Sequence, residues 1–202
     1  MTPSDIPTSA LKGSCRTALK EWAAVLEAMG EGRQILLLRK GGLLDPQDAF
    51  RETKEPFLFF PSYTHQAMGF LRTPYQRYME QARQRHPEDA AAVYLDWVGK
   101  VERITPLPDD ATFETLEPFH IYNRAFLNQR LQWQPQAPIV LMVIRFFRLS
   151  PSICLPFTSA YAGCRSWIDL GKSINVEQAR PVLNEAAWRE RLKALDAVLN
   201  RA

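Results

Sequence analysis

The sequence lacks long apolar runs and is poor in cysteine, and both features narrow the class of protein. Its longest aliphatic run covers residues 139–144, far fewer than the roughly twenty that a membrane-spanning helix needs. The polar residues 1–9 contain no apolar signal core. Three cysteines without a close pair favour neither a disulfide framework nor a zinc knuckle. We therefore expect a cytoplasmic protein that does not contact a membrane.

Acidic residues are missing from one long stretch of the chain. Positions 118–168 hold no Asp or Glu, although 22 acids in 202 residues would place about six there. The same stretch carries five arginines, one histidine and nine aromatic rings. The net charge of +3 is too small to indicate nucleic acid by itself, but guanidinium groups beside flat rings suit a ligand with phosphate and base. This composition predicts an anion-binding or nucleic-acid-binding module.

The motifs of several enzyme classes are absent or only loosely matched. There is no Walker-type glycine loop, and no histidine has a Cys or His two to four residues away, so zinc is not indicated. Asp45, Glu52 and Lys54 loosely match the carboxylate–carboxylate–lysine layout of two-metal nucleases, although Asp45 lies in a Leu-Asp-Pro turn. We expect no cofactor and no metal, and a metal-dependent nuclease stays open as an alternative.

Apolar periodicity predicts strands and helices in no regular βαβ repeat. Helical spacing marks residues 17–30, 75–85 and 111–131, and Asn184 suits the N-cap of a last helix. Strands are expected at 34–38, 57–60, 92–104, 139–149 and 164–170, with a proline-containing loop at 150–163. This order favours an α+β fold with a small, mainly antiparallel sheet or a β-barrel. Residues 1–15 are expected as a loose tail and 16–202 as one domain.

Two groups of side chains near predicted strand ends are candidates for binding an anion. Arg39 and Lys40 precede a Gly-Gly turn, where backbone can approach a phosphate closely. Tyr63, His65 and Gln66 follow a strand that ends at proline, and loops in such places commonly present functional groups. The structural alternatives are a solvated turn for the first group and a backbone cap for the second.

Further candidates lie in the acid-poor stretch. Arg145 stands near the end of the strongest predicted strand, and Tyr161, Arg165 and Trp167 combine a phenol, a guanidinium and an indole within seven residues. As a stacking platform they would contribute roughly 1–3 kcal/mol per base, and the alternative is a buried core corner with a paired arginine. Cys164 would be a nucleophile only beside a base, for which His65 and His120 are the candidates by elimination.

Four separate motifs resemble one protein family. They are Ala-Leu-Lys-Glu-Trp-Ala at 18–23, Ile-Leu-Leu-Leu-Arg-Lys-Gly-Gly at 35–42, Phe-Leu-Phe-Phe-Pro-Ser-Tyr-Thr-His-Gln at 57–66 and Tyr-Ala-Gly-Cys-Arg-Ser-Trp at 161–167. Together they are similar to the DUF1802 family of bacterial and archaeal proteins, defined only as a domain of unknown function. The resemblance brings no activity, but members beside restriction-endonuclease domains imply a link to DNA restriction-modification.

A shorter stretch is similar to ASCH domains, PUA-like barrels that bind RNA or modified bases. Their pattern Gly-x-Lys-x-x-Glu-x-Arg is met by Gly32 and Arg39, whereas Gln34 and Leu37 stand in place of the lysine and the glutamate. The replaced residues carry the hydrolytic chemistry of the catalytic relatives. This resemblance therefore implies a PUA-like barrel without amidohydrolase activity.

Taken together, the sequence predicts a single α+β domain that binds DNA or RNA without catalysis, with arginines on phosphates and rings on bases. Two alternatives stay open, a nucleic-acid-processing enzyme centred on His65 or on the nuclease-like set above, and a protein-interaction subunit. The main hypothesis depends on cations and rings that are distant in sequence, such as Arg39 and Trp167, lining one electropositive hollow.

Overall fold

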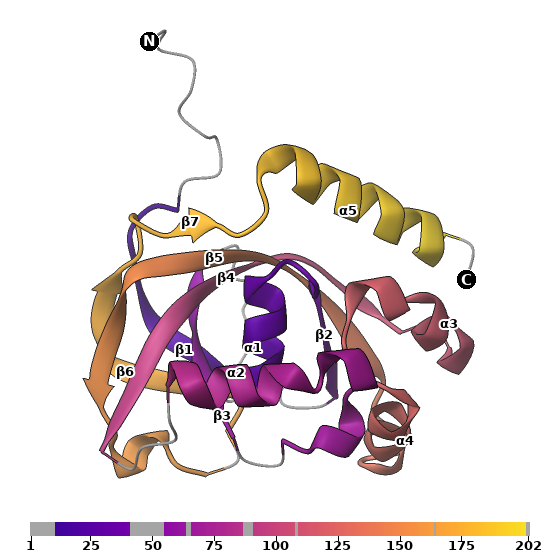
Figure 1. Cartoon of the computed structure of the whole chain (residues 1–202), viewed down its shortest axis with the longest axis horizontal. Helices are drawn as coiled ribbons and strands as arrows, with labels where there is room; N and C mark the ends of the chain where they lie inside the picture. The colour runs from indigo at the N-terminus through magenta and orange to yellow at the C-terminus, as the bar shows by residue number, and fades with distance from the viewer. Residues whose placement is uncertain are drawn as a thin grey trace, which may run out of the picture.

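One curled sheet of seven strands organises the fold (Figure 1). The computed structural model describes residues 11–40, 55–63, 66–86, 91–107, 109–163 and 165–200. The strands are β1 (Ser14–Trp22), β2 (Leu36–Lys40), β3 (Phe57–Ser62), β4 (Ala92–Pro106), β5 (Ile139–Pro156), β6 (Trp167–Asn175) and β7 (Arg180–Pro181). Their order is β2-β5-β4-β3-β1-β6, with β7 paired to β5. The β1–β3 pair is parallel and the other described pairs are antiparallel, which confirms the expected mixed fold with a mainly antiparallel sheet.

Five helices pack around this sheet. They are α1 (Ala23–Gly30), α2 (Arg77–Arg85), α3 (Asp110–Thr115), α4 (Arg124–Gln132) and α5 (Glu185–Leu199). Figure 1 shows α1 within the curl of the sheet, α2 crossing in front of it, and α5 lying above β5 with β7 to its left. The helical stretch expected at 111–131 contains two helices, α3 and α4, which are separated by residues 116–123. None of the helices in the described part of the chain is long and apolar enough to cross a membrane.

The longest strand, β5, serves as the common partner of three others. Along one side it pairs with β4, and along the other with β2 at residues 139–143 and with β7 at 147–148. Its apolar residues from Leu141 to Phe147 are buried on both faces, which is typical of a central strand. The strand continues to Pro156, so the loop expected from residue 150 is wrong in its first part. The register of β5 with β4 is irregular between Arg148 and Ile153, and this irregularity accommodates Pro151.

The first expected helix is wrong at its N-terminal half, because residues 14–22 form β1. Ser14 and Cys15, which were expected in the tail, belong to this strand. Ala18 and Leu19 are fully buried in two different hydrophobic clusters, one on each face of the sheet. Pairing of β1 with both β3 and β6 therefore overrides a four-residue apolar spacing that also fits a helix.

Helix α1 begins only at Ala23 and is buried along almost its whole length. Every residue from Ala23 to Met29 is buried, including Glu27. Its first turn has no cap of its own, and the side-chain oxygen of Gln66 accepts the N–H of Ala24 at 2.9 Å instead. A helix that is apolar all round must lie in a core, and here the curl of the sheet and α2 provide it.

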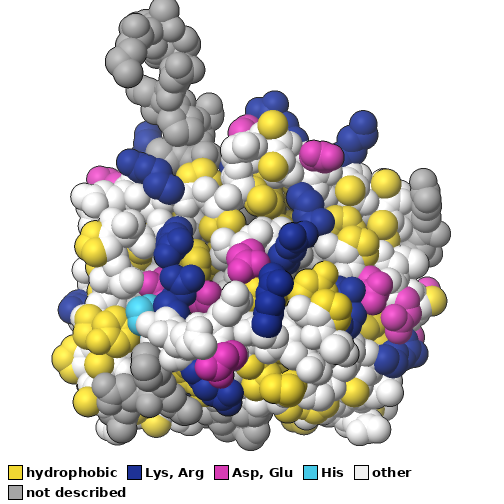
Figure 2. All heavy atoms as spheres, viewed as in Figure 1, with side chains coloured by type: hydrophobic (Ala, Val, Ile, Leu, Met, Phe, Trp, Pro, Cys, Tyr) yellow, Lys and Arg dark blue, Asp and Glu magenta, His cyan; other side chains and the backbone are white. Residues whose placement is uncertain are grey.

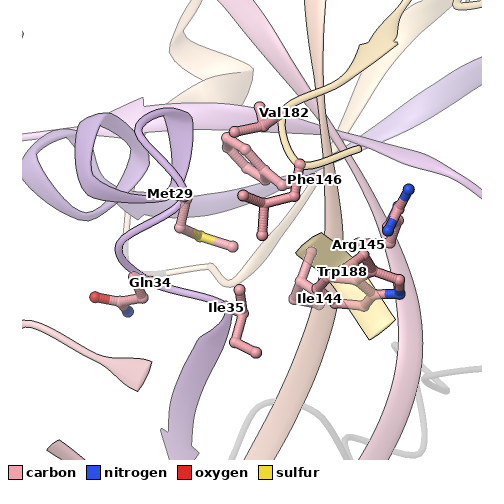
Figure 3. A pocket seen from close by; sticks show the side chains of 10 residues that line it. Met29, Gln34, Ile35, Ile144, Arg145, Phe146, Val182 and Trp188 are labelled. Atoms are coloured by element: carbon pink, nitrogen blue, oxygen red, sulfur yellow. The ribbon is translucent and has the colours of Figure 1, made fainter. Parts of the chain in front are cut away.

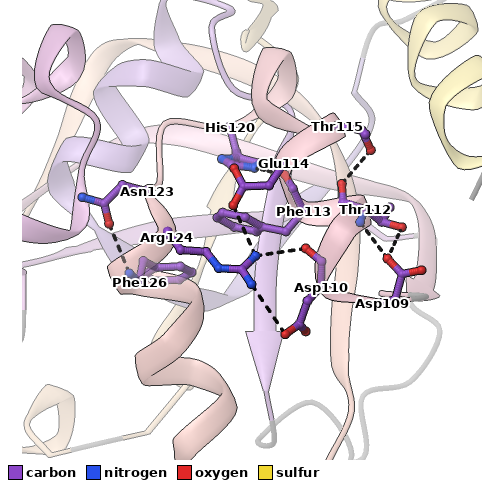
Figure 4. Close-up of polar contacts among 10 residues, drawn as sticks. All are labelled: Asp109, Asp110, Thr112, Phe113, Glu114, Thr115, His120, Asn123, Arg124 and Phe126. Atoms are coloured by element: carbon purple, nitrogen blue, oxygen red, sulfur yellow. Dashed lines mark hydrogen bonds and ion pairs between the residues drawn. The ribbon is translucent and has the colours of Figure 1, made fainter.

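Three other helices start at conventional side-chain caps. Asp109 accepts the N–H of Thr112 at 2.7 Å and Asn123 accepts that of Phe126 at 3.2 Å (Figure 4). The predicted N-cap Asn184 is confirmed, since its Oδ1 accepts the N–H of Ala187 at 2.9 Å. Each cap satisfies one of the backbone donors that a helix N-terminus leaves without a partner.

A glycine at the end of α1 allows close contact with Trp97 on β4. A Cβ at Gly30 would stand 2.4 Å from Trp97 Cη2 and 2.7 Å from Cζ2. The indole has no room to retreat, because it stacks on Phe146 with ring centroids 5.1 Å apart. We expect Gly30→Ala to lower the free energy of unfolding by about 1–3 kcal/mol, as overpacked cores do, measured by urea denaturation.

The matched control is Gly69→Ala, where no heavy atom lies within 4 Å of the added Cβ. An exposed substitution of this kind changes stability by about 0.5 kcal/mol or less. Equal stability of the two variants would show that Trp97 does not press on α1.

Candidate functional site

Arg39 lies inside the curl of the sheet and binds the protein itself. Its Nη1 donates to Glu21 Oε2 at 3.0 Å and to the Lys20 carbonyl at 3.2 Å. Both side chains are largely buried, at 14% exposure for Arg39 and 8% for Glu21. Three strands separate β2 from β1 in the sheet, so this ion pair forms across the curl. Arg39 therefore holds two distant strands together, and its charge is already compensated.

Arg145 lies on the other face of the sheet from Arg39. Arg39 is paired with Val140 on β5, and Arg145 is five residues further along that strand, where alternation directs its side chain to the opposite face. Its Nη2 contacts Glu185 Oε2 at 3.2 Å, and its guanidinium lies 4.9 Å from the centre of the Trp188 ring. Burial lowers the pKa of Arg145, while Glu185 and Glu102 raise it.

An apolar recess lies beside Arg145 and beneath the start of α5 (Figure 3). Its empty space of about 210 Å³ includes space that is open to solvent. Figure 3 shows the side chains of Arg145 and Gln34 pointing away from the hollow, which Met29, Ile35 and Phe146 line. Without a polar group directed into it, the recess has no feature that would select an anion.

The other predicted binding residues also have partners within the protein. Lys40 is buried, and its Nζ donates to the Leu131 carbonyl at 3.2 Å. The Tyr63 hydroxyl donates to the carbonyls of His86 at 2.6 Å and Ala82 at 3.3 Å, at the end of α2. Gln66 caps α1, as described above. His65, Cys164 and the nuclease-like set Asp45, Glu52 and Lys54 lie outside the described residues.

The predicted stacking platform is divided between the two faces of the sheet. Trp167 packs edge-on against Phe57 at 5.1 Å and belongs to the larger hydrophobic cluster. Tyr161 is in the smaller cluster, packs against Phe60 at 5.6 Å and donates its hydroxyl to the Leu170 carbonyl at 3.2 Å. Arg165, which lies between them in the sequence, is exposed. The predicted cations and rings thus do not line one hollow in the described structure.

Acidic residues just before the acid-poor stretch neutralise part of it. Arg124 contacts Glu114 at 3.2 Å and Asp110 at 3.8 Å, both from α3 (Figure 4). The local absence of acids in the sequence is therefore not an absence of acids in space. The arginines without an acidic partner come from several parts of the chain.

A different set of arginines lies around α1, where Glu27 and Glu31 contact Arg85 and Arg77 of α2 and Arg191 of α5 donates to the Arg33 carbonyl. Figure 2 shows Lys and Arg side chains spread over this region with a few acids among them. We call this set the arginine face. Its residues come from the turn after α1, from α2 and the turn before it, and from β5, β7 and α5. Its members are Arg33, Arg72, Arg77, Arg85, Arg148, Arg180 and Arg191.

Many of these guanidinium groups are held against aromatic rings. Arg72 lies 4.9 Å from the centre of the Tyr75 ring, Arg77 4.9 Å from Tyr78, and Arg191 5.0 Å from Phe119. The described residues contain eight cation–ring contacts, against about three for a chain of this length at one per 70–80 residues. Ring contact is thus a recurrent way of fixing arginines in this protein.

Ion pairs to α1 position the arginines of α2. Arg77 contacts Glu31 at 3.0 Å, and the Tyr78 hydroxyl donates to the same carboxylate at 2.7 Å. One turn earlier on α1, Glu27 accepts Arg85 at 2.8 Å. These pairs compensate the charges of both arginines while leaving part of each guanidinium at the surface.

One end of the arginine face is formed around Trp97. Arg85 and Arg148 both lie near this ring, at 5.7 and 5.5 Å from its centre. Arg180 is the direct cross-strand neighbour of Arg148. Within the described residues neither Arg148 nor Arg180 forms an ion pair. This end of the face therefore carries uncompensated positive charge.

The other end is formed by Arg33 and Arg191. The Nη2 of Arg191 donates to the carbonyls of Arg33 at 3.0 Å and Pro118 at 2.9 Å. Burial lowers the pKa of Arg191, and the positive charge of Arg33 lowers it further. Arg33 is exposed and has no acidic partner in the described part of the chain. A second patch of uncompensated charge is the result.

A buried carboxylate lies next to this face. Asp96, on β4, accepts from His86 Nε2 at 2.5 Å and from the hydroxyl of Ser152. His86 stacks on Tyr94 at 4.5 Å. The serine contacts the carboxylate and not the histidine, so this is not the order of a Ser-His-Asp triad. The three side chains fasten the end of α2 to β4 and β5. Among the described residues no three metal-ligating side chains gather.

His120, a candidate base by elimination, is a buried structural residue. Its ring stacks on Phe113 at 4.6 Å, and Nε2 lies 3.2 Å from the Phe113 carbonyl. Burial lowers the pKa of His120 from 6.5 to about 4. The histidine is therefore neutral in the folded protein at neutral pH and donates from Nε2.

This pKa predicts a loss of stability in acid. Between pH 6.5 and about 4 the unfolded chain binds a proton at His120 that the folded chain does not, so stability decreases as pH falls through this range. The decrease is about 3 kcal/mol at its low end. His120→Gln is expected to flatten this part of the curve of unfolding free energy against pH. An unchanged slope in the variant would contradict a neutral buried histidine.

The Glu21–Arg39 pair is expected to be structural. Glu21→Gln and Arg39→Met should each lower the free energy of unfolding by about 3 kcal/mol, because each leaves a buried partner without its counterpart. The double variant should lose clearly less than the sum of the two. Arg165→Met, at an exposed site, is the control and should change stability by about 0.5 kcal/mol or less. Additive losses would show that the pair is not coupled.

Part of the arginine face was visible in the sequence and part was not. The basic character of residues 75–85 marks α2 as a possible phosphate contact. Arg148 stands at the end of a predicted strand, whereas Arg33, Arg180 and Arg191 are isolated arginines with no local signal. Their proximity depends on β7 joining β5 and on α5 folding back over the sheet.

Comparison with known proteins identifies one match. A family model described as a domain of unknown function, DUF1802, matches residues 18–194. The chain matches no curated protein and no solved structure.

Proposed function

The chain belongs to the DUF1802 family, and from its geometry we propose that it binds nucleic acid through the arginine face. The supporting observation is that contacts around α1 bring together arginines that are distant in sequence. Arg77 and Arg85 bind Glu31 and Glu27. Arg148 shares the Trp97 ring with Arg85 and is the cross-strand neighbour of Arg180, and Arg191 donates to the Arg33 carbonyl. This differs from the set of residues expected from the sequence, although the class of ligand is the same.

Fixed guanidinium groups suit a phosphate backbone. A free arginine side chain carries about 2 kcal/mol of rotamer entropy. Part of this entropy is lost when the side chain binds a ligand. Ring contacts at Tyr75, Tyr78 and Trp97 already restrict their arginines. Because the planar fork is held in place before the ligand arrives, less entropy is lost on forming each phosphate contact.

The charge balance of the face favours an anion. Glu27, Glu31 and Glu117 compensate Arg85, Arg77 and Arg72, with Nη1 of Arg72 lying 3.0 Å from Glu117. Arg33, Arg148 and Arg180 keep their charges, and they lie at the two ends of the face. α1 lies between these ends, and its eight residues span about 12 Å. Several phosphates of one nucleic acid can therefore be contacted together.

The choice of nucleic acid to test first rests on the expected link to DNA restriction-modification. The resemblance to proteins beside restriction-endonuclease domains makes duplex DNA the first partner to test. Arginines alone read the backbone and not the sequence, so we expect binding with little base preference.

Salt dependence is the direct test. Arg33, Arg148 and Arg180 are the exposed arginines of the face without an ion pair in the described residues. Three such charges predict that log K falls with log salt concentration with a slope of about −2.7 for duplex DNA and about −2.1 for a single strand. Between 50 and 200 mM salt the affinity for duplex should fall by about forty-fold. Fluorescence anisotropy with a short labelled duplex measures both quantities.

Two triple variants of equal charge separate this face from the rest of the surface. Arg33→Gln, Arg148→Gln and Arg180→Gln together should abolish the salt-dependent binding. Arg16→Gln, Arg124→Gln and Arg165→Gln remove the same charge elsewhere and should leave most of it. An equal loss of binding in both triple variants would show that binding depends only on the net charge of the protein. Persistent binding by the first triple would disprove the proposal.

A further inference from the structure

Two arginines stand directly opposite each other where β5 meets β7. Arg148 is the register partner of Arg180, so their side chains leave the sheet on the same face. Directly opposed residues in an antiparallel pair have Cβ atoms about 4.5–5.5 Å apart, and like charges in this position repel. The fold thus contains a local electrostatic conflict between two exposed guanidinium groups.

No acidic side chain resolves this conflict in the described part of the chain. The carboxylates of Glu27 and Asp96 have other partners, since Glu27 accepts both bonds from Arg85 Nε, at 2.8 and 3.1 Å, and Asp96 accepts from His86 and Ser152. Arg148 is further fixed over the Trp97 ring. The pair is therefore held in place with two positive charges exposed to solvent.

The third arginine at this position adds donors without adding net charge. Arg85 lies near the same Trp97 ring as Arg148. Glu27 neutralises it through Nε, which leaves its two terminal nitrogens for another partner. The group thus offers the donors of three guanidinium groups. The three arginines and Glu27 together carry a net charge of +2, and Asp96 and His86 are not included in this sum.

We infer that the Arg148–Arg180 pair, with Arg85 beside it, is a binding site for a phosphomonoester dianion. A phosphomonoester carries about −1.5 to −2 charges at neutral pH, which matches two uncompensated arginines better than the single charge of a phosphodiester. In nucleic acid this group is the phosphate at the end of a strand. The inference rests on the proposed function only for this last step, because a small phosphorylated molecule offers the same group.

Inorganic phosphate tests the site without any nucleic acid. Near saturation it should raise the midpoint of thermal unfolding by about 5 °C, compared with chloride at equal ionic strength. Arg180→Gln should lose most of this rise. In phosphate-free buffer of low salt, the same variant should unfold no earlier than the wild type, because the repulsion has been removed.

Arg165→Gln is the control and should keep the full response to phosphate. The inference is overturned if chloride stabilises the protein as much as phosphate does, or if Arg180→Gln keeps the wild-type response. A large loss of stability of Arg180→Gln in phosphate-free buffer would also overturn it, since it would give Arg180 a structural role.

Oligonucleotides with and without a terminal phosphate separate this site from the proposed function. Bonds to a charged group contribute about 1.5–3 kcal/mol, so the phosphorylated strand should bind at least about tenfold more tightly. Equal, salt-dependent binding of both strands, with no response to phosphate, would remove this site and leave the arginine face. A response to phosphate without binding of any oligonucleotide would support a site for small phosphomonoesters and reject nucleic acid as the partner.

Discussion

The burial of α1 inside the curled sheet is the constraint on which the other features depend. Its residues from Ala23 to Met29 are buried, so its polar groups must find partners within the protein. Gln66 supplies one at the first turn, and Arg85 supplies one for Glu27. The second contact fixes α2 across α1 and so fixes where the arginines of α2 emerge. The position of surface charge is in this way a consequence of core packing.

Arginine has two distinct roles in the protein, and burial of the charge decides between them. Arg39 and Arg145 are largely buried and are compensated by Glu21 and Glu185, because an uncompensated charge in such places is too costly. Arginines of the second kind lie at the surface and are held by rings, as Arg148 is by Trp97. Ring contact fixes a guanidinium without cancelling its charge, which leaves the charge available to a partner.

The sequence predicted most strands and helices, but it did not predict which of them lie side by side. Strong apolar patterns predicted β3, β4 and β5, and Asn184 predicted the start of α5. β1 was mistaken for helix because its spacing fits both, and only its pairing on two sides decides. For the site, composition suggested the proposed ligand class, but Arg39 and Arg145 were expected to share a hollow. Their opposite faces follow from the β2–β5 register, which a single sequence does not encode visibly.

The acid-poor stretch shows why charge counted along the chain misleads. Arg124 belongs to it and is neutralised by Asp110 and Glu114 from the helix before it. Arg148 belongs to it too, yet its cross-strand neighbour is Arg180, outside the stretch. A charge is compensated or exposed according to its neighbours in space, and these are set by strand pairing. One of the two patches of uncompensated charge on the arginine face therefore lies where β5 changes partner from β2 to β7, and it is there that we propose an anion binds.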